Sequence, residues 1–117
     1  MDEKETHVRA YLYTHHYGRA NAAPRHRILE GLKEAWPHGT LALEDREFRA
    51  ILAQLRHKNV PVGGTSRDGV YVAASREELQ PIIADYRAKA ADLVVEANIL
   101  DRISFEQEPV LPGMRGK

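Results

Sequence analysis

The stretch from Glu44 to Ala73 constrains the fold of this chain more than any other part of the sequence. Its first half carries apolar residues at the spacing i, i+3, i+4 and i+7, which is typical of one face of an α-helix. These residues are Phe48, Ile51, Leu52 and Leu55. Asn59-Val60-Pro61 then ends the helix, because proline cannot continue it and favours an extended residue before it.

Two short β-prone runs follow this helix, from Val60 to Val62 and from Val70 to Ala73. The turn between them, Gly63 to Gly69, is polar and rich in glycine, and it ends in an Asp-Gly pair. Two β-prone runs joined by such a turn predict a β-hairpin. We therefore expect the order helix, strand, loop with Arg67 at its tip, and strand.

The segment Asp45 to Val62, DREFRAILAQLRHKNVPV, resembles the recognition-helix exit of bacterial and phage winged-helix proteins. These commonly run D-R-x-x-R-x-x-x-x-x-L-R-x-x-G-x-P-I, and the usual glycine is here Asn59, which also tolerates a left-handed backbone. Gly69 to Leu79 is similar to the segment that closes the wing and enters the next helix. The resemblance covers about half of the chain. It implies an α+β, mostly helical fold: a winged helix with a two-stranded wing, an N-terminal helix and a long C-terminal helix.

The resemblance also implies a function. It indicates a prokaryotic or phage protein that binds double-stranded DNA sequence-specifically, in transcription control or in replication or recombination. Some proteins use the same core to bind partners instead. The alternative is therefore a protein-interaction module that works through the C-terminal helix and tail.

Two further helices are expected before the organising stretch, over Glu3–Tyr17 and over Pro24–Trp36, the second with a proline suited to its first turn. Their apolar positions are Val8, Tyr11, Leu12, Ile28, Leu29, Leu32 and Trp36. A usual helix-turn-helix needs two helices and a turn between Trp36 and Val60, where there is room for little more than one helix. Either the middle helix is reduced to a turn, or the Glu3–Tyr17 helix completes the three-helix core, and we favour the second arrangement. Thr40 to Leu43 fits a short strand or the first turn of the next helix.

The longest periodic segment runs from Ser75 to Ile103, and Ser75 with Glu78 fits an S-x-x-E capping box at its start. It carries a heptad stripe of alternating three- and four-residue spacing. The stripe consists of Leu79, Ile83, Tyr86, Ala90, Leu93, Ala97 and Leu100. A helix of roughly 42 Å is longer than so small a core can cover. Its far end needs a partner, either the Glu3–Tyr17 helix or the same helix of a second copy.

We expect a homodimer through the part of this stripe that follows Leu79. The predicted dimerisation residues are Ile83, Tyr86, Ala90, Leu93, Ala97 and Leu100. The domain is expected to span residues 1–103, with its C-terminal helix over 75–103, and residues 104–117 to form a flexible tail.

The face of the central helix opposite its apolar stripe suits the major groove of DNA. Alanines allow close approach, while arginine and glutamine can make bidentate contacts to guanine and adenine. The predicted groove-facing residues are Arg46, Arg49, Ala50, Ala53, Gln54 and His57. Arg56 and Lys58 are expected at phosphates, and Arg67 at the backbone or minor groove. The competing interpretation is a solvated face whose arginines pair with neighbouring acidic residues.

Composition limits the other possibilities. The net charge is zero, but residues 18–74 carry a surplus of three positive charges, which is where DNA binding needs it. There are no cysteines, and adjacent histidines at 15 and 16 point away from each other on a helix, so no metal site is expected. No membrane span, catalytic motif or cofactor signature is present. A cytoplasmic protein without enzymatic activity is expected.

Overall fold

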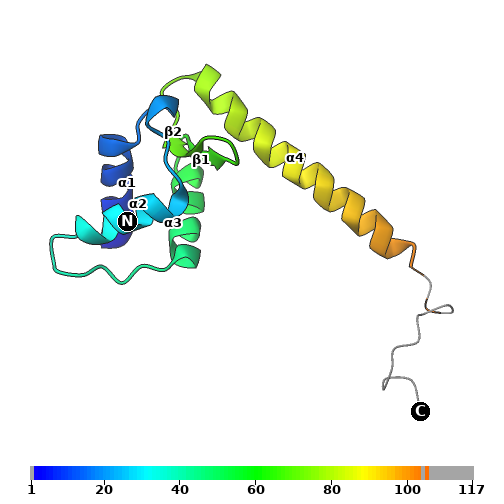
Figure 1. The fold of residues 1–117 in the computed structure, drawn as a ribbon, viewed down its shortest axis with the longest axis horizontal. Helices are drawn as coiled ribbons and strands as arrows, with labels where there is room; N and C mark the ends of the chain where they lie inside the picture. The colour runs from blue at the N-terminus through cyan, green and yellow to red at the C-terminus, as the bar shows by residue number, and fades with distance from the viewer. Residues whose placement is uncertain (1, 104, 106–117) are drawn as a thin grey trace, which may run out of the picture. The chain divides into compact units, whose positions relative to one another are not determined.

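The computed structural model describes residues 2–103 and 105, which form a mostly helical α+β fold (Figure 1). The elements in chain order are α1 (Glu3–His15), η1 (Arg19–Asn21), α2 (Arg25–Glu34), α3 (Asp45–His57), β1 (Val62–Thr65), β2 (Gly69–Val72) and α4 (Arg76–Asp101). The chain divides into two compact units, residues 1–86 and 87–117, each described by itself below. Within the described residues, no helix is both long and apolar enough to cross a membrane.

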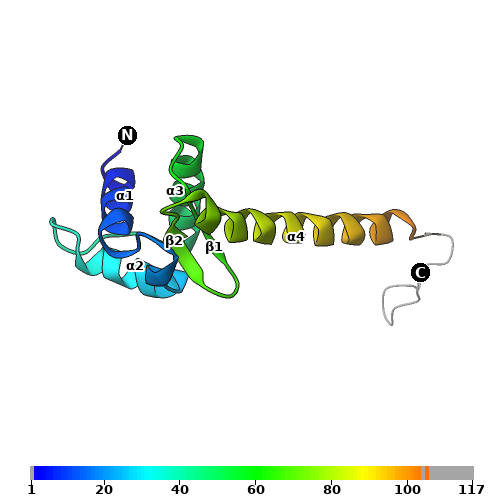
Figure 2. The same ribbon diagram turned by 90° about the horizontal axis from the view of Figure 1, so that it is seen from above.

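Helices α1, α2 and α3 form the core of the first unit, and each of them contacts the other two. In both views α1 and α3 stand side by side and α2 crosses them (Figure 2). Their buried side chains are Val8, Leu12, Ile28, Leu32, Phe48, Ile51, Leu52 and Leu55. The expectation that the N-terminal helix completes a three-helix core is confirmed.

The connection from α2 to α3 has no regular secondary structure between Pro37 and Glu44. Both predicted readings of Thr40 to Leu43, as a strand or as a first helical turn, are wrong. Leu41 and Leu43 are nevertheless only 3% and 2% exposed, while their neighbours face solvent. Alternate residues of an extended backbone point the same way, so this irregular segment still adds two leucines to the core.

Helix α1 ends at His15, before the predicted Tyr17, because the backbone that follows pairs with β2. The carbonyl of His16 accepts a hydrogen bond from the Val72 amide (2.9 Å), and the Gly18 amide donates to the Val72 carbonyl (2.7 Å). Helix α2 likewise ends before the predicted Trp36, since the following Pro37 disfavours helical geometry there.

The predicted antiparallel hairpin is confirmed, with Val62 opposite Val72 and Thr65 opposite Gly69. Its loop is shorter than expected, because Gly63 and Gly64 belong to β1 and only residues 66–68 connect the strands. A Cβ atom on Gly63 would lie 2.6 Å from Cγ2 of Ile82. This glycine therefore makes room for α4, and it lies in a strand where a turn was predicted.

The hairpin is also attached to the connection between α1 and α2. Val70 and Ala23 exchange two backbone hydrogen bonds, of 2.8 and 3.2 Å. Gly69 has a φ of 95°, and a Cβ atom there would lie 2.4 Å from the Ala23 carbonyl oxygen. Only glycine fits this approach.

Helix α4 begins at the predicted cap, with the Glu78 amide donating to the Ser75 hydroxyl (3.2 Å), although the Glu78 carboxylate accepts from the Ala74 amide in place of the Ser75 amide. Its first turns belong to the first unit, where Ile82 and the half-buried Leu79 pack with Tyr71 and Ala73. The helix ends at Asp101, two residues before the predicted Ile103. The predicted tail, apart from Phe105, lies outside the described residues.

Candidate nucleic-acid interface

The outer face of α3 is the part of this helix that points away from the core. We use this name for Arg46, Arg49, Ala50, Ala53, Gln54 and His57. All six are exposed except Ala53, which is half-buried. The four buried residues of α3 lie on the opposite side, so the predicted inside and outside of this helix are confirmed.

The two arginines of the outer face differ in what they contact. Arg49 Nε lies 3.1 Å from Asp45 Oδ2, and Arg25 Nε of α2 lies 2.6 Å from Asp45 Oδ1. The hydrogen bond from Arg25, more than any other interaction, lowers the pKa of the Asp45 carboxyl. Arg46 forms no ion pair or hydrogen bond within residues 2–103 and 105. Arg46 therefore offers its guanidinium to a ligand, whereas Arg49 is held in place by Asp45.

Arg56 and Lys58, predicted at phosphates, are occupied inside the domain. The Arg56 guanidinium carbon lies 5.2 Å from the centre of the Tyr86 ring, and Nη1 donates to the Val62 carbonyl (3.3 Å). Lys58 Nζ lies 2.7 Å from Oε2 of Glu5, a carboxylate that is buried in α1. These contacts favour a structural role for both residues over the predicted one.

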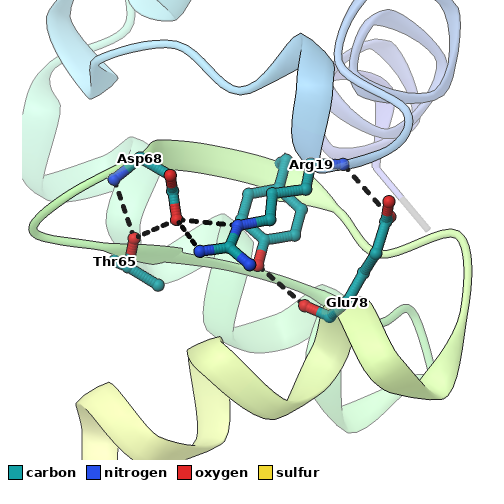
Figure 3. A network of polar contacts seen from close by, with 5 residues as sticks. Arg19, Thr65, Asp68 and Glu78 are labelled. Carbon is teal, nitrogen blue, oxygen red and sulfur yellow. Dashed lines mark hydrogen bonds and ion pairs between the residues drawn. The ribbon is translucent and has the colours of Figure 1, made fainter.

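Arg67 lies at the tip of the hairpin, within the 66–68 loop, and is exposed. Its neighbour Asp68 anchors the loop. The Asp68 carboxylate accepts hydrogen bonds from Arg19 Nε (3.0 Å) and from the Thr65 hydroxyl (3.1 Å), and the Asp68 amide donates to Thr65 Oγ1 (2.9 Å; Figure 3). The tip that carries Arg67 is therefore braced against η1.

Glu78 connects this network to the start of α4. Its Oε1 accepts from the amides of Arg19 (3.1 Å) and Ala74 (2.9 Å), and its carbonyl accepts from the Tyr71 hydroxyl (2.7 Å; Figure 3). Burial raises the pKa of the Tyr71 phenol. The sequence identified Glu78 as a capping residue, but Arg19 and Asp68 gave no local signal because their partners are remote in the chain.

The predicted dimerisation residues lie on α4 and differ in exposure. Ile83 is half-buried in the first unit, and Tyr86 is 46% exposed beneath Arg56. Ala90 and Ala97 are exposed, and Leu93 and Leu100 are 69% and 66% exposed. The stripe therefore begins in the core of the first unit and becomes fully accessible in residues 87–101.

Comparisons of the chain with protein-family models, with curated protein sequences and with solved structures found no match.

Proposed function

We propose that this chain is a winged-helix protein that binds double-stranded DNA as a dimer, at a specific site used in transcription, replication or recombination. The observation that carries the proposal is the exposed outer face of α3 beside a hairpin with an exposed arginine at its tip. Helix α3 contacts β1 directly, so helix and hairpin act from one rigid core.

The geometry of α3 suits the major groove, which is about 12 Å wide and admits an α-helix. Ala50 and Ala53 let the helix approach closely. Arg46 and Gln54 are free to make bidentate contacts to guanine and adenine edges. Arg49, fixed by Asp45, is better suited to a positioning contact with a phosphate.

The hairpin tip supplies a contact that does not depend on sequence. Arg67 would reach the DNA backbone or minor groove next to the groove that holds α3. Because Arg56 and Lys58 are occupied, only a few phosphate contacts are expected from each copy. The slope of log K against log salt falls by about 0.9 for each contact, so two to three contacts predict a slope of roughly −2 to −3 per copy.

A second candidate is a protein-interaction module, favoured by the exposed Leu93, Val94 and Leu100 of α4. In that case the outer face of α3 is a solvated helix surface. A DNA-binding measurement distinguishes the two candidates. A protein-interaction module is expected to show no salt-sensitive binding to duplex DNA.

The experiment is selection from a random duplex library, followed by fluorescence anisotropy on the selected and a scrambled duplex over a salt series. Arg46→Ala is expected to lose about 1–3 kcal/mol of discrimination between the two duplexes. Arg67→Ala is expected to weaken both about equally and to reduce the salt slope by about 1. Arg9→Ala, an exposed arginine on α1, is the matched control.

If none of these substitutions changes DNA binding, or if no duplex binds at low salt, the proposed interface is wrong. Binding lost equally with Arg9→Ala would indicate a general charge effect and would also contradict it.

A further inference from the structure

Residues 87–101 of α4 are all exposed, although many of them are apolar. Leu93, Val94 and Leu100 are 69%, 59% and 66% exposed. A contiguous apolar surface of this kind marks an interaction site. Two features of this helix indicate what covers it: the order of large and small residues, and the signs of the flanking charges.

We propose that a second copy of the chain covers this surface, and that the two α4 helices run antiparallel. The inference specifies the partner orientation of the proposed dimer and rests on that dimer, but it does not depend on DNA binding. In the proposed register, Ala90 lies opposite Leu93 of the second copy, and the two-fold axis passes between residues 91 and 92.

Packing favours this orientation. Ile83, Ala90 and Ala97 occupy heptad position a, and Tyr86, Leu93 and Leu100 occupy position d. In an antiparallel pair, position a of one helix lies opposite position d of the other. Here that places the small Ala90 and Ala97 opposite Leu93 and Tyr86 of the second copy, and Ile83 opposite Leu100. In a parallel pair, equivalent residues meet. Alanine would then face alanine at two layers and leave space, whereas interiors are close-packed.

The charges that flank the heptad stripe also favour the antiparallel orientation. In the antiparallel register, Lys89 lies beside Glu96 of the second copy. Two-fold symmetry repeats this contact, so two opposite-charge pairs form. In a parallel pair, Glu96 would instead lie beside Asp101 of the second copy, twice, and such flanking charges set helix orientation.

The other apolar residues of this helix provide a control surface. Val95 and Ile99 are 54% and 48% exposed, but they lie on the side of the helix away from Leu93. They carry no heptad spacing that continues into Ile83 and Tyr86. Leu93→Glu is therefore expected to abolish self-association in sedimentation, and Val95→Glu to leave it intact.

Cross-linking tests the orientation directly, because the chain has no cysteines of its own. With Val94→Cys, the two thiols would lie about 8 Å apart along the axis, on the same side of the helix pair, and a short bifunctional thiol reagent is expected to join two copies. With Ala97→Cys, no disulfide dimer is expected, since the two copies of residue 97 would be about 16 Å apart along the axis. A parallel pair gives the reverse pattern, and that result would overturn the proposed orientation while leaving the dimer.

Charge reversal tests the register. Glu96→Lys is expected to raise the dimer dissociation constant about fivefold, because it replaces attraction to Lys89 by repulsion. The double variant Glu96→Lys with Lys89→Glu is expected to return the dissociation constant to the wild-type value. In a parallel pair, Glu96→Lys would tighten the dimer by pairing with Asp101. A monomeric wild-type chain overturns the dimer itself, whatever the DNA-binding result.

Discussion

Glu5 is the buried charge of this molecule among the described residues, at 3% exposure. A buried carboxylate is costly without a partner, and Lys58 supplies one at 2.7 Å from the end of α3. The contact joins the first turn of α1 to the residue that caps α3. At this scale, one ion pair adds a polar link between the first and third helices, whose apolar faces share one buried cluster.

Replacing Lys58 by methionine keeps the aliphatic stem and removes the charge. Loss of the partner of a buried carboxylate costs about 3–5 kcal/mol. The Lys58 side chain is 47% exposed, so water compensates in part, and we expect a loss of roughly 1–3 kcal/mol in the free energy of unfolding. Urea denaturation measures it. Lys4→Met is the matched control, because the side chain of its partner Glu47 is 46% exposed whereas that of Glu5 is 4% exposed, and an equal loss in both variants would contradict this role for Glu5.

At the scale of elements, the hairpin shows how a correctly predicted unit depends on remote contacts. Hydrophobic runs and glycine positions predicted the hairpin, although β1 begins two residues after the predicted Val60 and extends through the first two glycines of the predicted turn. They did not indicate that Ala23 would pair with Val70, or that Ile82 would lie against Gly63. Those neighbours belong to other elements, so no local pattern around the hairpin encodes them.

Tyr71 joins the hairpin to α4, and its removal has a pH signature. Tyr71→Phe loses the hydrogen bond to the Glu78 carbonyl and is expected to cost about 1 kcal/mol near neutral pH. Because burial raises the pKa of the folded Tyr71 above the ordinary 10.0, its contribution is fully present below pH 10. It is lost as pH rises through the raised pKa.

The difference in unfolding free energy between wild type and Tyr71→Phe should therefore narrow above pH 10. Urea titrations from pH 7 to 11 test this, and Tyr13→Phe, at an exposed tyrosine, is the control. A difference that widens with pH would show that folding does not raise the pKa of Tyr71.

At the scale of the whole molecule, the buried core and the proposed dimerisation surface occupy different stretches of the chain. In the described part, the last buried residue is Ile82, and every residue of 87–103 is exposed. The first unit therefore contains all of the buried core. The predicted function also divides: the outer face of α3 and Arg67 lie in the first unit, and the accessible part of the heptad stripe lies in the second.

A chain that ends after residue 90 tests this division. We expect it to unfold cooperatively, with a free energy within about 1 kcal/mol of the full chain's monomer, because it keeps every buried side chain. It should also fail to self-associate in sedimentation. A truncated chain that remains dimeric would show that residues 91–101 are not the interface.

Local chemistry was sufficient to predict the helices, the hairpin and the outward direction of Arg46, because periodicity, caps and turns act between residues that are near in sequence. It did not reveal the contacts of Arg56 and Lys58, which lie at a charged helix end and contact Tyr86 and Glu5. Partners such as Glu5 and Lys58, or Arg19 and Asp68, stand 53 and 49 positions apart in the chain. Only the packing of α1, α3 and the hairpin brings them together, so only the tertiary structure decides which cations remain available to a ligand.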